Sequence, residues 1–139
     1  MSRPDFSVEG GSVSNGKPFV LYIDDEIEQC RLVGDFFTSR GMDIMFAFNG
    51  RMAKEILSRA TPSLIFLDLH MPKMSGKEFL KYLRLDLKNK ALPVFVITGF
   101  PKDISNLEQE AFEIQGFFTK PVKLEELLIE TKKILNLKK

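Results

Sequence analysis

The stretch Leu64-Ile65-Phe66-Leu67-Asp68 places four large apolar residues directly before a carboxylate. A continuous apolar run of this length is typical of a strand that is buried on both faces of a parallel sheet. A carboxylate at the end of such a strand is rarely tolerated without a partner or a chemical role. Asp68 is therefore the first candidate for a functional residue.

Three other apolar runs also end in a charged or reactive group. They are Phe19–Ile23, followed by Asp24-Asp25-Glu26; Pro93–Ile97, followed by Thr98-Gly99; and Gly116–Thr119, followed by Lys120-Pro121. In open parallel sheets, sites form outside the carboxyl ends of the strands. If the four runs are parallel strands, their terminal groups meet at one edge of one sheet.

Segments with helical spacing of apolar residues separate these strands. The expected helices cover Glu26–Arg40, a stretch between Asn49-Gly50 and Pro62, Lys77–Leu87, about Pro101 to Ile114, and Glu125–Leu135, with a further strand over Asp43–Phe48. The apolar residues expected on buried helix faces include Ile27, Cys30, Val33 and Phe37 in the first helix and Leu87 in the third. Strands that alternate with helices predict a (βα)5 doubly wound α/β fold with a parallel sheet.

The flavodoxin-like strand order 2-1-3-4-5 sets strands 1 and 3 side by side. It brings Asp24 and Asp25 next to Asp68, with Thr98 on the adjacent strand and Lys120 one strand further. Three carboxylates in one cleft repel one another, and a divalent cation removes that conflict. All-oxygen ligands favour Mg²⁺ over zinc. A carboxylate at such a site can act as the nucleophile in phosphoryl transfer, while a lysine and a hydroxyl stabilise the transferred group.

Composition excludes several other classes of protein. A net charge of +1 argues against general electrostatic binding to nucleic acid or to a membrane surface. No apolar run approaches the roughly 20 residues of a membrane helix, and the N-terminus lacks a signal-peptide pattern. Cys30 is the single cysteine, so no intrachain disulfide forms and a reducing cytoplasm is the expected setting. Residues 1–17 are rich in Ser, Gly and Asn and are expected to form a flexible tail, with one domain over 18–139.

The chain resembles the receiver domains of two-component response regulators, such as the chemotaxis regulators. The matching motifs are Asp24-Asp25-Glu26, Leu67-Asp68-Leu69-His70-Met71-Pro72, Ser75-Gly76, Val96-Ile97-Thr98-Gly99 and Thr119-Lys120-Pro121. The spacing from Asp68 to Thr98 and to Lys120 also matches the family. Five motifs in order make the resemblance specific, although each alone is weak.

The resemblance implies a role for each matching residue. Asp68 accepts the phosphoryl group; Asp25 and Asp68 bind Mg²⁺ directly, Asp24 binds it through water, and the backbone carbonyl of His70 is a further ligand. Mn²⁺ can substitute for Mg²⁺. Thr98 and Lys120 contact the phosphoryl group, and Phe117 matches the aromatic switch position. Pro121, after a cis peptide bond, and Gly76 are structural, while His70 and Phe100 occupy positions that tune the phosphoryl lifetime.

The resemblance also implies a regulatory protein that is not an enzyme. A histidine kinase or a phosphotransfer protein donates the phosphoryl group, and the surface formed by helix 4, strand 5 and helix 5 then changes its partner preference. A homodimer through this surface is a further expectation, whereas direct contact with nucleic acid or membrane is not expected. The chain ends soon after the fifth helix, so we expect no output domain within it.

Other interpretations stay open from the residues alone. A receiver-like interaction module that works without phosphorylation predicts a degenerate acidic pocket. A phosphatase with an aspartyl nucleophile would have Asp-x-Asp after the first strand, and a flavodoxin would have a Ser/Thr-rich phosphate loop there. Single residues also have simpler explanations: Asp24 as a helix cap, Lys120 as a solvated lysine, His70 as an exposed loop residue, Phe117 as core filler and Cys30 as a small buried residue.

Overall fold

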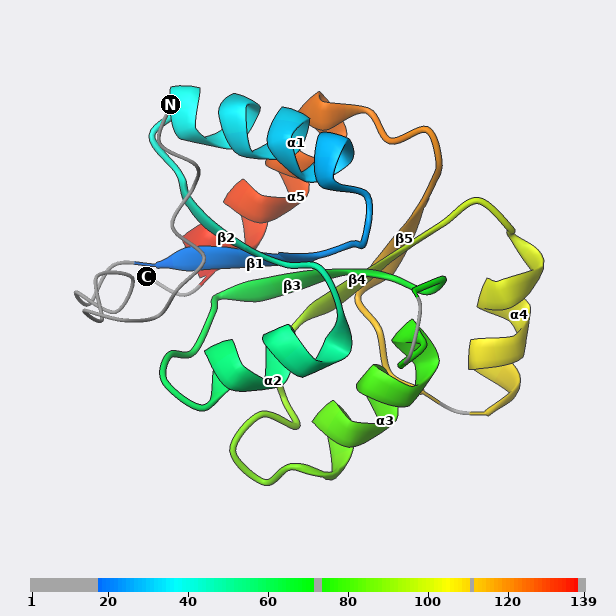
Figure 1. Ribbon diagram of the computed structural model, residues 1–139. Coiled ribbons are helices and arrows are strands. Elements are labelled where there is room, and N and C mark those ends of the chain that lie inside the picture. The colour runs from blue at the N-terminus through cyan, green and yellow to red at the C-terminus, as the bar shows by residue number, and fades with distance from the viewer. Residues whose placement is uncertain (1–17, 72–73, 111, 138–139) are drawn as a thin grey trace.

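Strands and helices alternate from Phe19 to Leu137 (Figure 1). The computed structural model describes residues 18–71, 74–110 and 112–137, so the expected tail over 1–17 and Pro72 lie outside the described residues. The elements are β1 Phe19–Ile23, α1 Ile27–Ser39, β2 Asp43–Ala47, α2 Gly50–Leu57, β3 Leu64–Asp68, α3 Gly76–Leu85, β4 Val94–Thr98, α4 Lys102–Gln109, β5 Gly116–Thr119 and α5 Leu124–Leu137. All strand pairs are parallel, in the order β2-β1-β3-β4-β5. This confirms the doubly wound fold and its flavodoxin-like order.

Helices cover both faces of the sheet. Figure 1 shows α1 and α5 on one face and α2 and α3 on the other. The strand residues alternate between two cores: Ile65 and Leu67 face α2, α3 and α4, while Leu64 and Phe66 face α1 and α5. Both sets are fully buried, which is why β3 reads as a continuous apolar run.

Local sequence signals explain where several helices begin and end. Gly41 has a φ of +78°, a conformation that suits glycine, and it terminates α1 while the N–H groups of Gly41 and Met42 donate to the carbonyls of Thr38 and Phe37. Asn49 caps α2 by accepting from the N–H of Met52 at 2.8 Å. A reciprocal capping box of Ser75 and Glu78 starts α3.

Three expectations about helix faces and lengths were wrong. Ile27 is 55% exposed because it opens α1 at the edge of the sheet, whereas Cys30, Val33 and Phe37 are buried as expected. Leu87 is 84% exposed because α3 ends at Leu85 and the Asp86 side chain accepts from the N–H of Lys88, which turns the chain.

The fourth helix was expected to reach Ile114 but ends at Gln109. The chain leaves the helix early because Gln115 pairs with the start of β4: its N–H donates to the carbonyl of Val94 at 2.8 Å, and its side-chain oxygen accepts from the N–H of Val94 at 2.6 Å. Sheet pairing therefore overrides helix propensity there. Across the described residues, no helix has the length and apolar composition needed to cross a bilayer.

Candidate functional site

Sheet register brings the predicted site residues to one edge. Ile23 of β1 pairs with Leu67 of β3, so the next residues, Asp24 and Asp68, lie side by side where the strands end. Thr98 pairs with Thr119, the residue before Lys120, and the N–H of Lys120 donates to the Thr98 carbonyl at 2.8 Å. The parallel ladder therefore places all four groups at the carboxyl edge.

Three carboxylates form the centre of this edge. One oxygen from each of Asp24, Asp25 and Asp68 lies within 4.8 Å of the others. Asp24 and Asp68 are buried, while Asp25 is exposed. Backbone N–H groups satisfy one oxygen of each buried residue: Glu26 donates to Asp24 Oδ1 at 2.9 Å, and His70 donates to Asp68 Oδ1 at 3.2 Å.

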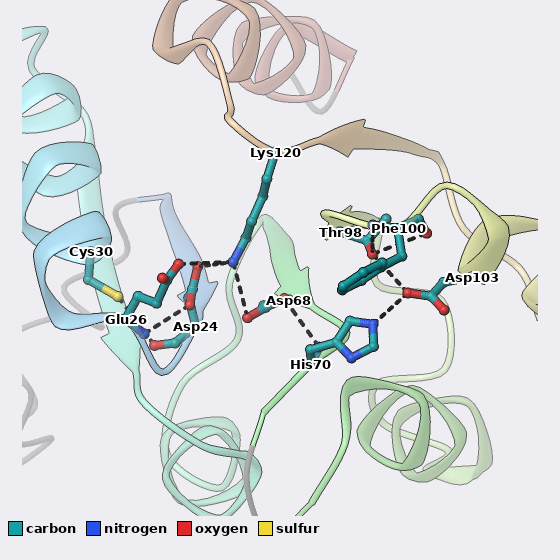
Figure 2. Close-up of polar contacts among 9 residues, drawn as sticks. All are labelled: Asp24, Glu26, Cys30, Asp68, His70, Thr98, Phe100, Asp103 and Lys120. Atoms are coloured by element: carbon teal, nitrogen blue, oxygen red, sulfur yellow. Dashed lines mark hydrogen bonds and ion pairs between the residues drawn. The ribbon is translucent and has the colours of Figure 1, made fainter.

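Lys120 neutralises part of this negative charge. Its Nζ lies 3.4 Å from Asp68 Oδ2, 3.5 Å from Asp24 Oδ2 and 3.0 Å from Glu26 Oε1. Figure 2 shows the Lys120 side chain reaching toward these three carboxylates. The peptide bond from Lys120 to Pro121 is cis. Sequence reasoning gave Glu26 no role of its own, and its only signal was its place directly after the two aspartates.

Burial and mutual repulsion shift the pKa values at this edge. Burial raises the pKa of Asp24 to about 7, with a further increase from the charge of Asp68, although the Glu26 N–H opposes it. Burial also raises the pKa of Asp68, against the His70 N–H and the Lys120 charge. For Lys120 burial lowers the pKa, but its contacts with Glu26, Asp24 and Asp68 outweigh that and leave it raised.

The donor set fits a hard divalent cation. Asp24 Oδ2 is buried and accepts no hydrogen bond from the described residues, although the Lys120 ammonium lies 3.5 Å away. An oxygen left in this state is costly unless a cation or a proton compensates it. Three carboxylates with no sulfur or imidazole among them suit Mg²⁺ better than zinc.

Thr98 points to Asp103, away from Asp68. Its Oγ1 donates to Asp103 Oδ2 at 2.9 Å and accepts from the N–H of Phe100 at 2.9 Å. The same Asp103 oxygen lies 2.6 Å from Nε2 of His70. Figure 2 shows these side chains on the opposite side of Asp68 from Asp24. Asp103 was not among the predicted site residues, and its only signal was an acid in the first turn of the helix after Thr98.

The remaining predicted residues lie outside the group of three carboxylates. Phe100 is 61% exposed, and its ring meets the His70 ring edge to face, with centroids 5.0 Å apart. Phe117 on β5 is 49% exposed, so the alternative of a core filler is wrong.

Gly76 packs against the backbone that follows Asp68: a Cβ there would clash with the Asp68 carbonyl oxygen. Cys30 is buried beside the site, and its thiol donates to the Asp24 carbonyl at 3.4 Å.

The comparison with known proteins agrees with the fold and the acidic edge. The sequence model of the response regulator receiver domain matches residues 20–132. The chain belongs to this family. The acidic edge of the sheet is thus a receiver-domain pocket formed by Asp24, Asp25 and Asp68, an arrangement typical of the Mg²⁺ site of receivers.

Relatives place the receiver domain in different settings. The chain is 35% identical to a protein-glutamate methylesterase/protein-glutamine glutaminase of Treponema denticola over 73% of this chain but only 28% of that protein. It is 30% identical to the sporulation initiation phosphotransferase F of Bacillus subtilis over 86% of this chain and 94% of that protein. Among solved structures, the Francisella response regulator 1452 receiver domain matches with a TM-score of 0.78 and 26% identity, covering 88% of this chain and all of that one.

Mg²⁺ binding should weaken as the pH falls below about 7. The pKa of Asp24 is raised to about 7 in the metal-free fold, so a proton must leave before this carboxylate can face a cation. The apparent Kd for Mg²⁺ should rise by up to about tenfold per pH unit below that value. Calorimetric titration with Mg²⁺ over about pH 5.5 to 8.5 measures this slope.

The same shift predicts how metal-free stability depends on pH. Because the folded pKa lies above the unfolded value, the fold binds the proton more tightly, so the free energy of unfolding falls as pH rises from about 4 to 7. Asp24→Asn should flatten both the Mg²⁺ slope and the stability slope. Equal slopes in the variant and the wild type would assign them to another group.

Proposed function

We propose that this receiver domain is a phosphoacceptor switch of a two-component system, phosphorylated on Asp68. The observation that carries the proposal is the ion pair at 3.4 Å between Lys120 Nζ and the buried Oδ2 of Asp68, beside the carboxylates of Asp24 and Asp25. A nucleophile, a cation and an oxygen-rich metal site then lie together at one edge. A histidine kinase or a phosphotransfer protein is the donor.

The transfer exchanges one bond for another. A carboxylate oxygen of Asp68 attacks phosphorus, the bond from phosphorus to the donor histidine nitrogen breaks, and its electron pair returns to the imidazole. Lys120 neutralises charge on the transferred group. Mg²⁺, held by Asp25, Asp68 and the His70 carbonyl, with Asp24 acting through water, would neutralise the phosphoryl oxygens; Mn²⁺ would serve in its place.

Phosphorylation adds charge where Thr98 can respond. The new group carries about −1.5 to −2 charges, and a hydroxyl next to it gains by donating to its oxygens. Thr98 would have to leave Asp103, its partner at 2.9 Å, and carry the β4–α4 connection with it. The α4-β5-α5 surface, which includes exposed Phe117, would then change its preference for a downstream partner or a second copy of the chain.

The lifetime of the phosphoryl group depends on access of water to Asp68. His70 follows Asp68 by two positions, and its ring is held between Asp103 and Phe100. We propose that these two aromatic side chains set the rate of hydrolysis by shielding or admitting the attacking water. In this proposal the domain is a regulator and not an enzyme: it accepts a phosphoryl group on Asp68, and water slowly hydrolyses that acyl phosphate.

Incubation with acetyl phosphate and Mg²⁺ tests the proposal. The intact protein should gain the mass of one phosphoryl group, and peptide mapping should locate it on Asp68. Chelation of Mg²⁺ should prevent the gain. No gain in a protein that still binds Mg²⁺ would contradict the proposal and favour an interaction module that works without phosphorylation.

A further inference from the structure

One carboxylate oxygen links the proposed switch residue to the loop after Asp68. Asp103 lies in the first turn of α4, and its Oδ2 is 2.9 Å from Thr98 Oγ1 and 2.6 Å from His70 Nε2 (Figure 2). The Asp103 side chain is 25% exposed, so protein surrounds most of it. The contact joins three segments that are separate in the sequence: the β3–α3 loop, the end of β4 and the start of α4.

The bond from Thr98 to Asp103 competes with any bond from Thr98 to a phosphoryl group. A threonine hydroxyl has one proton to donate. In this structure Thr98 Oγ1 lies 2.9 Å from Asp103 Oδ2, and among the described residues its only other acceptor within hydrogen-bond distance is the carbonyl of Phe100, at 3.3 Å. A bond to an ionised acceptor is stronger than one between neutral groups. Thr98 therefore loses a good partner when it turns to Asp68.

His70 keeps Asp103 in place. The Asp103 oxygen that accepts from Thr98 also meets the His70 ring, and the Phe100 ring packs against that imidazole at 64°. Thr98 in turn accepts from the N–H of Phe100, which ties the start of the β4–α4 connection to the same cluster. The carboxylate is thus anchored from the Asp68 side of the site, so it does not follow Thr98 freely.

We propose that Asp103 is a positioning residue that holds Thr98 and the amino end of α4 in the unphosphorylated arrangement. It opposes the switch, because phosphorylation must break the bond between Thr98 and Asp103 before Thr98 reaches the phosphoryl group. This inference rests on the proposed function of Asp68. It assigns to one residue of α4 the resting balance between the two states of the switch.

Beryllofluoride, a phosphoryl mimic, tests the inference in the presence of Mg²⁺. Asp103→Ala should bind it about 3- to 10-fold more tightly than the wild type, because the mimic no longer competes with the hydrogen bond from Thr98 to Asp103. A hydrogen bond of this kind changes a dissociation constant by roughly tenfold or less. The matched control is Glu108→Ala, which removes another carboxylate from α4 at an exposed position. Its affinity should stay within about twofold of wild type.

A double-mutant cycle with Thr98→Val separates positioning from simple loss of charge. If Asp103 acts through the Thr98 hydroxyl, Asp103→Ala should change the affinity in the wild type and leave it unchanged in Thr98→Val. The same gain in both backgrounds, or no gain in the wild type, would overturn the inference. Failure of the wild type itself to bind beryllofluoride would instead contradict phosphorylation of Asp68.

A second readout needs no phosphoryl mimic in the variant. The Thr98 methyl resonance of unliganded Asp103→Ala should move toward its position in the beryllofluoride-bound wild type, and the resonance of Glu108→Ala should not. A purely structural role would not move the signal toward that particular position. A signal that stays at its wild-type position, or moves elsewhere, would overturn the inference.

Discussion

Asp68→Asn should abolish phosphorylation by acetyl phosphate, with a loss of at least about a thousandfold in rate. The amide oxygen of asparagine is a poor nucleophile, and it cannot form a stable acyl phosphate. The fold should survive, because an amide oxygen can still accept from the His70 N–H that now donates to Asp68 Oδ1. Intact mass after incubation with acetyl phosphate and Mg²⁺ measures the loss.

The same variant should make the metal-free protein more stable at alkaline pH. The pKa of Asp68 is raised in the fold by burial, so its carboxylate costs free energy once the proton has left. Asparagine removes that cost, while Lys120 keeps Asp24 and Glu26 as partners. We expect the gain to be present at about pH 8 and to shrink toward pH 4, where the folded carboxyl keeps its proton and the unfolded one approaches its own pKa.

Asp35→Asn provides the matched control, because Asp35 is an exposed aspartate on α1. It should leave both phosphorylation and stability at wild-type levels. Urea unfolding in the presence of a metal chelator at about pH 4 and pH 8 measures the stability change. A variant of Asp68 that still gains one phosphoryl mass at wild-type rate would place the acceptor elsewhere, and one that is less stable at both pH values would contradict the cost assigned to burial.

Phe66→Ala should destabilise the fold by about 3–5 kcal/mol. Phe66 is fully buried at the centre of β3, and its ring packs among four other aromatic rings. The partners of Phe66 are Tyr22, Phe37, Phe95 and Phe118, with centroid distances of 6.0, 6.4, 5.7 and 6.0 Å. Truncation leaves a cavity that the surrounding strands and helices cannot close. The loss is large, because the free energy of unfolding of a small domain is only about 5–15 kcal/mol.

Phe117→Ala is the control of the same residue type. Phe117 is 49% exposed on β5, so its truncation should cost less than about 1 kcal/mol. Chemical denaturation of both variants, fitted with a common slope, gives the two costs. Equal losses would mean that Phe117 packs as tightly as Phe66 and is not an exposed residue of the α4-β5-α5 surface.

Much of the fold follows directly from the sequence, because the signals are local. Leu64–Asp68 is apolar at every position but the last, since both faces of β3 are covered by helices and Asp68 faces the other carboxylates at the end of the strand. Gly41, Asn49 and Ser75 mark helix ends through short-range hydrogen bonds. The shared end of neighbouring strands then brings Asp24 beside Asp68 by geometry alone.

Expectations failed where a distant segment decided the outcome. The fourth helix stops at Gln109 because Gln115 pairs with Val94 on another strand, which helical periodicity cannot show. Leu87 continues the apolar spacing of α3, but the turn at Asp86 removes it from the helix. In both cases backbone pairing or a turn competed with a weak local preference and won.

By itself, the sequence determined the alternation of strands and helices, the acidic residues at the strand ends and the residue expected to carry the phosphoryl group, because hydrophobic spacing and residue types are enough to predict them. Only the tertiary structure decided which way the Thr98 hydroxyl points. Its partner Asp103 comes from α4, and His70 anchors that partner from the β3–α3 loop. Such a contact depends on side-chain direction across three segments, and no pattern along the chain specifies it.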